Sequence, residues 1–448
     1  MRNRRSKRNF KNNRNNLEII SKALLIINII CLIIFIISSV KLKKETTLSK
    51  HNSQENITNS EISENNLNIS NSQSSGNAQN NQNTLMSENA QNNQSTNLNI
   101  PQSTTINMAF TGDIMCHNTI YNDALNKTTN EYDFSYIFDD IKYHIQTADI
   151  AIGNLETTFA GSSRGYSSYP TFNTPENLAY TLKKVGFDVL TTANNHCYDK
   201  GYSGIESTID FLDDADISHT GTYKSEEDQN TILIKNVKGI KIAFLSFTYG
   251  TNGIKVPTNK QYSVNLIDKS LILNQLSLAK SNNPDMICVS MHWGVEYQTS
   301  PNSVQKDLAD FLFQNGTDII IGNHPHVLQN MEKRTITQSD GTTKDGFIVY
   351  SLGNFLADQN KKYTRDSAIL KLNITKDAEG KITINSATYT PTYIYKDSSK
   401  SSPKFKIVNL NNSIESYDAG YTYLNKSTYN TFLTELTNIK TILGKEIL

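Results

Sequence analysis

Apolar and polar positions alternate in two different ways from residue 106 to the C-terminus. Short, largely apolar runs bounded by polar loops predict buried strands, and apolar residues spaced three or four apart predict amphipathic helices. The runs fall at residues 106–111, 150–152, 188–193, 242–247, 286–291, 318–321, 347–350, 368–374 and 382–385. Strands that alternate with helical segments in this way indicate an α/β fold whose strands are largely buried.

Helical spacing appears between these runs. Apolar positions from Tyr136 to Ile145 share one helical face, as residues spaced by 3.6 positions do. Pro175 suits the first turn of a helix, and Gly186 suits its end. Further helices are predicted from Ile205, Ile209 and Leu212, from Val304, Leu308, Phe311 and Leu312, and at residues 428–443.

The N-terminal part of the chain has a different pattern. Residues 23–40 carry no charge and are long enough to cross about 30 Å of hydrocarbon as a helix. Seven basic residues crowd the extreme N-terminus, at residues 2–14, and three closely follow the apolar run. The positive-inside rule therefore predicts a cytoplasmic N-terminus with everything after Val40 outside. A cleaved signal peptide is the alternative, but its apolar region is normally shorter and ends at a small-residue cleavage site. We therefore expect an uncleaved anchor.

Low-complexity sequence separates this run from the rest. Asn, Ser, Gln and Thr dominate residues 45–103, and the hexapeptide that starts at Asn77 recurs at Asn89. Such a segment has too little apolar surface to fold and is typical of a flexible tether. We expect a basic cytoplasmic tail (1–22), a transmembrane anchor (23–40), a disordered linker (41–103) and one folded domain (104–448).

Charge and cysteine content bear on the expected partners and on the redox state of the protein. The 43 basic and 43 acidic residues cancel, which gives no reason to expect nucleic acid as a partner. Cys31 lies in the predicted anchor. The other three cysteines, Cys116, Cys197 and Cys288, cannot all pair within one chain, so we expect them to be reduced.

Polar side chains follow the ends of five predicted strands. In an open α/β sheet, the carboxyl ends of the strands meet at one crevice. Carboxylate, amide and imidazole groups there suit a hard or borderline metal ion such as Mn, Zn, Fe or Mg. The residues in question are Asp113, Glu156, Asn195, His196, His292, His324 and His326.

The motifs around these residues resemble those of the CapA family, which is associated with poly-γ-glutamate capsule biosynthesis and belongs to the calcineurin-like metallophosphoesterase superfamily. The resemblance runs from Ala109 to Phe355 and implies a four-layer αββα sandwich. Six motifs carry it in order: Gly112-Asp113-Ile114-Met115, Asn154-Leu155-Glu156, Ala193-Asn194-Asn195-His196, His292-Trp293-Gly294-Val295-Glu296, His324-Pro325-His326-Val327 and Tyr350-Ser351-Leu352-Gly353-Asn354-Phe355.

The resemblance also implies roles. His196 corresponds to the histidine that acts as proton donor. Met115 stands where the phosphoesterases have a ligand histidine, and Glu156 stands where they usually have a bridging aspartate. Arg164 and Lys200 lie in nearby loops and are candidates for contact with an anionic substrate. The ligands of a divalent metal, expected to be Mn, Zn or Fe, would be Asp113, Glu156, Asn195, His292, His324 and His326.

Three functions remain open at this point. The first is a metal-dependent hydrolase that makes or processes a capsule polymer at the cell surface. The second is an extracytoplasmic metallophosphoesterase, and the third is a non-catalytic scaffold for a membrane polymer synthase. The expected partners are an anionic polymer or other cell-surface substrate, the membrane through the N-terminal helix, and subunits of such a synthase. The expected location is the cell membrane, with the large domain outside.

Overall fold

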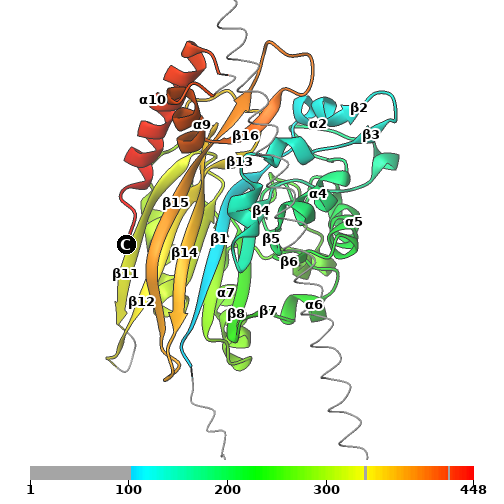
Figure 1. The fold of residues 1–448 in the computed structure, drawn as a ribbon. Coiled ribbons are helices and arrows are strands. Elements are labelled where there is room, and N and C mark those ends of the chain that lie inside the picture. The colour runs from blue at the N-terminus through cyan, green and yellow to red at the C-terminus, as the bar shows by residue number, and fades with distance from the viewer. Residues whose placement is uncertain (1–101, 338–340, 422–423, 448) are drawn as a thin grey trace, which may run out of the picture. The chain divides into compact units, whose positions relative to one another are not determined.

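The computed structural model describes residues 102–337, 341–421 and 424–447, which all belong to one compact unit (Figure 1). The predicted tail and anchor, together with Cys31 and most of the linker, lie outside these residues. Within the described ranges, no helix combines the length and the hydrophobicity that crossing a membrane requires.

Two sheets form the centre of the domain. Sheet A has eight strands, and β13 (Asn354–Leu356) pairs beside β1. The other strands of sheet A are, in spatial order, β16 (Phe405–Asn409), β15 (Ile382–Lys396), β14 (Asp366–Lys376), β1 (Thr104–Ile114), β4 (Ile150–Leu155), β5 (Val189–Thr191) and β6 (Ser218–Thr220).

Sheet B has six strands, of which β12, β10, β9 and β8 run parallel. Its order is β11 (Leu328–Thr337), β12 (Thr343–Leu352), β10 (Ile319–Asn323), β9 (Met286–His292), β8 (Ile240–Thr248) and β7 (Leu233–Val237). A small hairpin of β2 (Leu125–Asn126) and β3 (Glu131–Tyr132) lies apart from both sheets.

Helices cover the outer faces of the sheets. The described helices are α2 (Asn118–Ala124), α3 (Lys142–Gln146), α4 (Asn177–Val185), α5 (Gly201–Asp214), α6 (Glu226–Asn230), α7 (Lys269–Ser281), α8 (Ser303–Gln314), α9 (Leu410–Asp418) and α10 (Lys426–Leu443). Short 3₁₀ turns are η1 (Ser135–Phe138), η2 (Ser162–Arg164) and η3 (Thr258–Ser263).

The core has a layered arrangement. Alternate apolar residues of β1 and β8, such as Phe110 and Phe244, meet in one cluster between the sheets. The opposite face of sheet A packs against α2, α3 and α4, and that of sheet B packs against α7 and α8. Near the C-terminus, α10 packs against β11 of one sheet and β15 of the other, so it covers the edge between them.

The α/β class predicted from the sequence is confirmed, and each of the nine predicted runs overlaps an observed strand. The helix predicted from Pro175 ends as expected, since Gly186 takes up a left-handed conformation after α4. Two details of the prediction are wrong. The face from Tyr136 to Ile145 belongs to η1 and α3, which a turn separates, and Val304 is exposed because it lies in the first turn of α8.

Candidate metal centre

The polar side chains after the strands come from both sheets. In sheet A, Asp113 near the end of β1 lies opposite Asn154 of β4, and Glu156 follows β4 directly. In sheet B, His292 at the end of β9 lies opposite Asn323 of β10. Because parallel strands end at the same edge, each sheet brings its own set of ligands to one end of the domain.

Asp113 is the most tightly held of these groups. One of its carboxylate oxygens accepts a hydrogen bond from the Asn154 amide at 2.8 Å, and the other accepts one from Nδ1 of His326 at 3.0 Å. Burial by itself raises the pKa of Asp113, but the hydrogen bond and the positive charge of His326 outweigh it and hold that pKa below its usual value. Asp113 therefore stays ionised.

Glu156 is buried at the centre of the cluster. Its Oε1 lies 3.5 Å from Nε2 of His292 and 3.8 Å from Nε2 of His326. Donor atoms of Glu156, His292 and His324 lie within 4.8 Å of one another, and so do those of Asp113, Glu156 and His326. Glu156 belongs to both groups, so it would help to hold a cation bound at either of them.

Several donor atoms in the cluster lack a partner. Neither carboxylate oxygen of Glu156 accepts a hydrogen bond from the described residues, and Nδ1 of His324 is likewise unpaired, although both side chains are buried. Burial and the nearby charge of Asp113 raise the pKa of Glu156 well above its usual value. Unpaired buried polar atoms are rare in folded proteins, because each costs desolvation free energy. A divalent cation would satisfy these atoms, so the residues present fit a metal.

The histidines differ in their electrostatic environment. Burial lowers the pKa of His292 to about 3, and burial together with His292 lowers that of His324 to about 2, so both rings are neutral. Neutral imidazole is the form that binds metals. Burial opposes protonation of His326 too, but the carboxylates of Glu156 and Asp113 raise its pKa to about 9.

The backbone that carries the last two histidines is strained. His324 has a φ of 95° and His326 a φ of 59°, and Pro325 lies between them. Residues with a side chain rarely adopt positive φ, and such conformations cost on the order of 1–3 kcal/mol each. The surrounding structure maintains this strain, and donor atoms of both imidazoles lie within 4.8 Å of the Glu156 carboxylate as a result.

Asn195 and His196 follow β5 and have different surroundings. The side-chain oxygen of Asn195 lies 2.7 Å from Nε2 of His292, which places it among the candidate ligands. Nδ1 of His196 lies 2.8 Å from Oδ2 of Asp199, and the edge of the Phe172 ring packs against its face. His196 is therefore oriented by Asp199, and its Nε2 faces the side-chain amide nitrogen of Asn252 at 3.5 Å.

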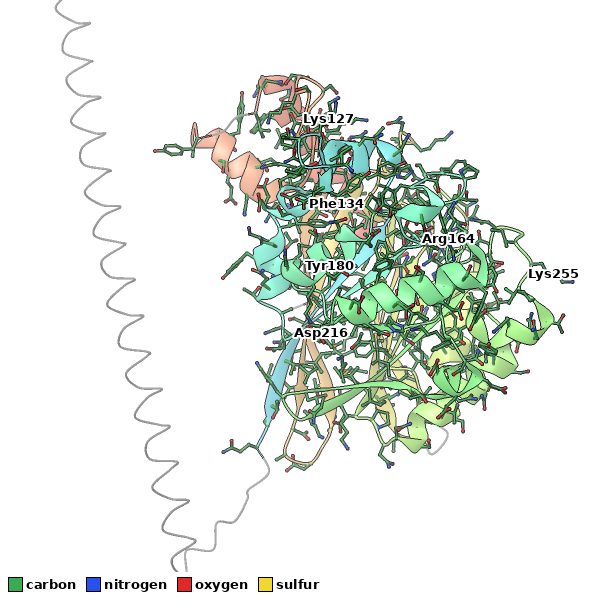
Figure 2. All side chains as sticks on the ribbon, turned by 90° about the vertical axis from the view of Figure 1, so that its right-hand side faces the viewer. Lys127, Phe134, Arg164, Tyr180, Asp216 and Lys255 are labelled. Atoms are coloured by element: carbon green, nitrogen blue, oxygen red, sulfur yellow. The ribbon has the colours of Figure 1, made fainter. Side chains whose placement is uncertain are left out.

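The two predicted substrate contacts lie apart from this network. Nη1 of Arg164 donates to the Ser203 hydroxyl at 2.9 Å, and Figure 2 shows Arg164 on the outer surface of the domain. Lys200 is the residue that precedes α5. Among the described residues, neither cation has a hydrogen bond or ion pair with the proposed ligands.

Other residues of the centre were missed or left without a role in the sequence analysis. Asn154 and Asp199 are in or next to its motifs, so their spacing could have suggested them. Asn252 accepts a hydrogen bond from the Asn195 amide at 3.1 Å and comes from the loop after β8. Tyr249, about half exposed, lies over the rings of His292 and His324, with a centroid separation of 4.5 Å from the latter. No pattern in the sequence marks these two loop residues.

The three described cysteines are buried and free, as predicted. Burial raises the pKa of each thiol, to about 12 for Cys197. They are therefore protonated and are not suited to bind a metal as thiolates.

The fold and this cluster define an α/β protein with a candidate site for a divalent metal. A family model described as "Bacterial capsule synthesis protein PGA_cap" matches residues 107–359, more than half of the chain. The chain therefore belongs to this family of bacterial capsule synthesis proteins.

Individual relatives agree with the family. The capsule biosynthesis protein CapA of Bacillus anthracis is 31% identical over 280 residues, which are 61% of this chain and 65% of that protein. The PGA biosynthesis protein CapA of Bacillus subtilis (strain 168) is 31% identical over 304 residues, 66% of this chain and 75% of that protein. The chain thus spans slightly less than two thirds of the Bacillus anthracis relative.

Among solved structures, the NAD nucleotidase NadN of Haemophilus influenzae is similar over 76% of this chain and 61% of that chain, with 12% identity and a TM-score of 0.41.

Proposed function

We propose that this protein is a membrane-anchored, metal-dependent hydrolase of the calcineurin-like metallophosphoesterase type. It would act on a capsule polymer, poly-γ-glutamate, at the outer surface of the cell. Membership of the capsule synthesis family supports the biological role. The N-terminal apolar run and its basic flanks support the location, with the large domain outside and subunits of a membrane polymer synthase as partners.

One observation carries the proposal of a metal-dependent reaction. The Glu156 carboxylate is buried with both oxygens unpaired, and it is shared by two groups of candidate ligands. A protein that only needed a packed scaffold would be more stable with an apolar or amide side chain at this position. The oxygen and imidazole donors are suited to Mn, Zn or Fe.

Two sets of residues would each hold one divalent cation. Asp113, Glu156 and His326 would hold one cation, and Glu156, His292, His324 and Asn195 a second. A divalent cation held there supplies Lewis-acid polarisation of the scissile group. Hydrolysis of an amide of the polymer breaks the C–N bond, forms a C–O bond with water and leaves a proton to be delivered to the nitrogen.

His196 would deliver that proton. Asp199 accepts a hydrogen bond from Nδ1 of His196 and also from the backbone N–H of Phe172 at 2.6 Å, so its orientation is fixed from two sides. The protonated form of His196 would donate from Nε2 to the leaving nitrogen, which is the role of a general acid. Asp199 is a positioning residue, because it acts through the histidine.

Metal analysis of the purified full chain is the first test. We expect at least one equivalent of Mn, Zn or Fe, and its loss when His324 and His326 are both replaced by Ala. Circular dichroism spectra should be the same for the two proteins. A correctly folded wild-type chain that takes up no metal at micromolar concentration would contradict the proposal.

His196→Ala distinguishes a hydrolase from a scaffold. We expect the variant to retain metal and fold but to release polymer fragments about a hundredfold more slowly or worse, which is the usual contribution of a general acid. Release of inorganic phosphate from phosphoesters, with no change in polymer length, would favour the phosphoesterase alternative. Unchanged yield and chain length of the polymer in cells that carry His196→Ala would favour the scaffold.

The location has its own test. Protease added to cells stripped of their wall should remove the large domain by cutting in the segment 41–103. Cleavage that occurs only after lysis would show that the domain faces the cytoplasm and would refute the proposed location.

A further inference from the structure

The outer face of sheet A is only partly covered by helices, because α2, α3 and α4 leave part of β1, β14 and β15 without one. In β14, the residues Ala368, Leu370, Leu372 and Ile374 point into the core between the sheets, so the alternate positions point outward. In Figure 1 the lower halves of β1, β14 and β15 carry no helix in front of them, and Figure 2 shows the same face bare in profile. This part of the outer face is therefore open to solvent.

The outward side chains on this face are amides and hydroxyls that hydrogen bond across the strands. The Asn373 amide donates to Asn107 at 2.8 Å, and the Asn385 amide donates to Asn373 at 2.7 Å. The hydroxyls of Thr105 and Thr375 are 2.8 Å apart. These cross-strand contacts hold the polar groups in fixed positions over three neighbouring strands.

A cavity of about 330 Å³ opens in this face. Its lining combines amide and hydroxyl side chains with a single cation and contains no carboxylate. The lining residues are Asn107, Met108, Thr147, Ala148, Lys371, Asn373, Ser386 and Thr388. The nearest acid along the chain is Asp149, whose carboxylate pairs with Lys238 at 2.6 Å and accepts the backbone N–H of Asn107 at 2.9 Å.

Lys371 makes no ion pair with any carboxylate of the described residues. Its only polar contact among the described residues is Nδ1 of His144, at 3.4 Å. The side-chain oxygen of Asn409 accepts the backbone N–H of Asn412, so the Asn409 amide nitrogen donates to Nε2 of His144 at 3.0 Å. The neutral ring then carries its proton on Nδ1 and cannot accept from Lys371 as well.

This leaves a half-buried ammonium group without a counter-charge. Burial lowers the pKa of Lys371, and no acid offsets the effect. The side-chain amide nitrogen of Asn107 and the hydroxyls of Ser386 and Thr388 also make no hydrogen bond with the described residues. The cavity thus offers one cation and several free polar groups to a ligand.

We propose that the face around Lys371 is a docking site for the capsule polymer, a γ-linked polyamide that carries a carboxylate on every residue. A carboxylate of the polymer pairs with Lys371, and its amide groups hydrogen bond with Asn107, Ser386 and Thr388. An extended array suits a linear chain better than a small anion, because the fixed polar groups continue beyond the cavity to Thr105 and Asn385. The identity of the polymer rests on the proposed function.

The docking site is separate from the metal centre. Asn107 and Asp113 are six residues apart on β1, which at about 3.3 Å per residue places them roughly 20 Å from each other along the strand. The site would hold the polymer near the domain while another part of the polymer reaches the metal centre.

Binding of a fluorescein-labelled γ-linked decaglutamate to the full chain in detergent, measured by fluorescence anisotropy, tests the proposal. We expect Lys371→Met to weaken binding about tenfold, and Lys371→Arg to retain it. The matched control is Lys127→Met, a change of another exposed lysine, labelled in Figure 2, at a site distant from the cavity. It should bind like the wild type. Binding should also weaken as salt is added, because the pair with Lys371 is partly exposed.

A variant without metal ligands distinguishes failure of the docking site from failure of the proposed hydrolase function. The double variant His324→Ala/His326→Ala should bind the oligomer normally, although it lacks metal. Loss of binding in that variant, together with normal binding by Lys371→Met, would show that the oligomer binds only at the metal centre and would overturn the docking site. Failure of the wild-type chain to bind at millimolar concentration would overturn it as well.

Discussion

At the scale of single residues, the metal centre consists of groups that are costly to bury. Among the described residues, neither oxygen of Glu156 accepts a hydrogen bond and Nδ1 of His324 makes none, and two histidines adopt strained backbone conformations. Each of these features lowers the stability of the metal-free protein. Their concentration at one place is typical of a functional site, where ligand binding offsets the cost.

Replacement of Glu156 by Gln tests this view. The amide cannot ionise, so the folded variant no longer has the cost of keeping a carboxyl protonated beside Asp113. We therefore expect the metal-free variant to unfold at the same temperature as the wild type or higher. We also expect metal affinity to fall by at least about tenfold, since a ligand shared by both groups loses its charge. Thermal unfolding in the presence of chelator and metal titration would measure the two effects. A less stable metal-free variant with unchanged metal affinity would show that Glu156 is structural.

At the scale of elements, the ligands depend on close approach between strands. A Cβ at Gly112 would lie 2.0 Å from the carbonyl oxygen of Gly353, and the next residue, Asp113, donates its N–H to that same oxygen at 2.8 Å. Only glycine lets β1 approach the turn before β13 in this way. The position of Asp113 is therefore set by a backbone contact as well as by its own side chain.

Gly112→Ala should separate these two backbones. We expect a loss of about 3 kcal/mol in the free energy of unfolding, as for severe overpacking, together with weaker metal binding. Gly250→Ala is the matched control, because a Cβ there meets nothing within 4 Å and its φ is not positive. Chemical denaturation of both variants would measure the difference. Equal stabilities for the two would mean that the strands can move apart at little cost.

We expect the contact between β14 and α10 to depend on pH. Asp366 is buried, and burial together with the charge of Glu435 on α10 raises the pKa of Asp366 to about 9. The folded protein therefore keeps this carboxyl protonated at neutral pH, whereas the unfolded chain ionises it near pH 4. The stability that this group contributes is complete below about pH 4 and is lost as the pH rises towards 9.

Asp366→Asn should remove that dependence. An amide cannot ionise, so we expect the variant to be more stable than the wild type at pH 8, by on the order of 1–3 kcal/mol, and nearly equal to it at pH 4. Urea denaturation at the two pH values would measure the difference in free energy of unfolding between the variant and the wild type. A variant that loses the same stability at both would indicate that the carboxyl group makes a specific contact instead.

At the scale of the whole molecule, the metal centre joins the two sheets. Asp113, Glu156 and Asn195 follow strands of sheet A, and His292, His324 and His326 follow strands of sheet B. An ion bound between them would connect the sheets at the end of the domain where their strands terminate. Metal binding is thus linked to the packing of one sheet on the other.

We expect added metal to raise the unfolding temperature of the protein. A ligand that binds only the folded state at one hundred times its Kd stabilises by about 2.7 kcal/mol, which corresponds to a shift of several degrees. His326→Ala should show a much smaller shift, because it removes a ligand supplied by sheet B. Calorimetry with and without Mn or Zn would measure this, and equal shifts in both proteins would mean that the metal binds elsewhere.

Much of this fold could be predicted from the sequence because strands and helices leave local patterns. The apolar runs from residue 106 to residue 385 each overlap a strand, and Gly186 ends α4 where expected. Less regular pieces were not predictable. The edge strand β11 alternates between buried and exposed residues and was missed, and the face from Tyr136 to Ile145 was predicted as one helix although a turn divides it. Periodicity records which residues are buried and does not show where the backbone turns.

The α/β class, the family resemblance and the set of polar residues at strand ends could all be predicted from the sequence, because these properties reside in neighbouring residues. The arrangement of that set depends on the packed fold. The tertiary structure showed that Glu156 is shared by two groups of histidines and carboxylates, that Asp199 orients His196, and that Asn252 joins from a distant loop. It also showed that Lys371 lines a cavity with amide and hydroxyl side chains and without a carboxylate. These relations depend on which face of each strand meets which partner, and the packing of two sheets determines that.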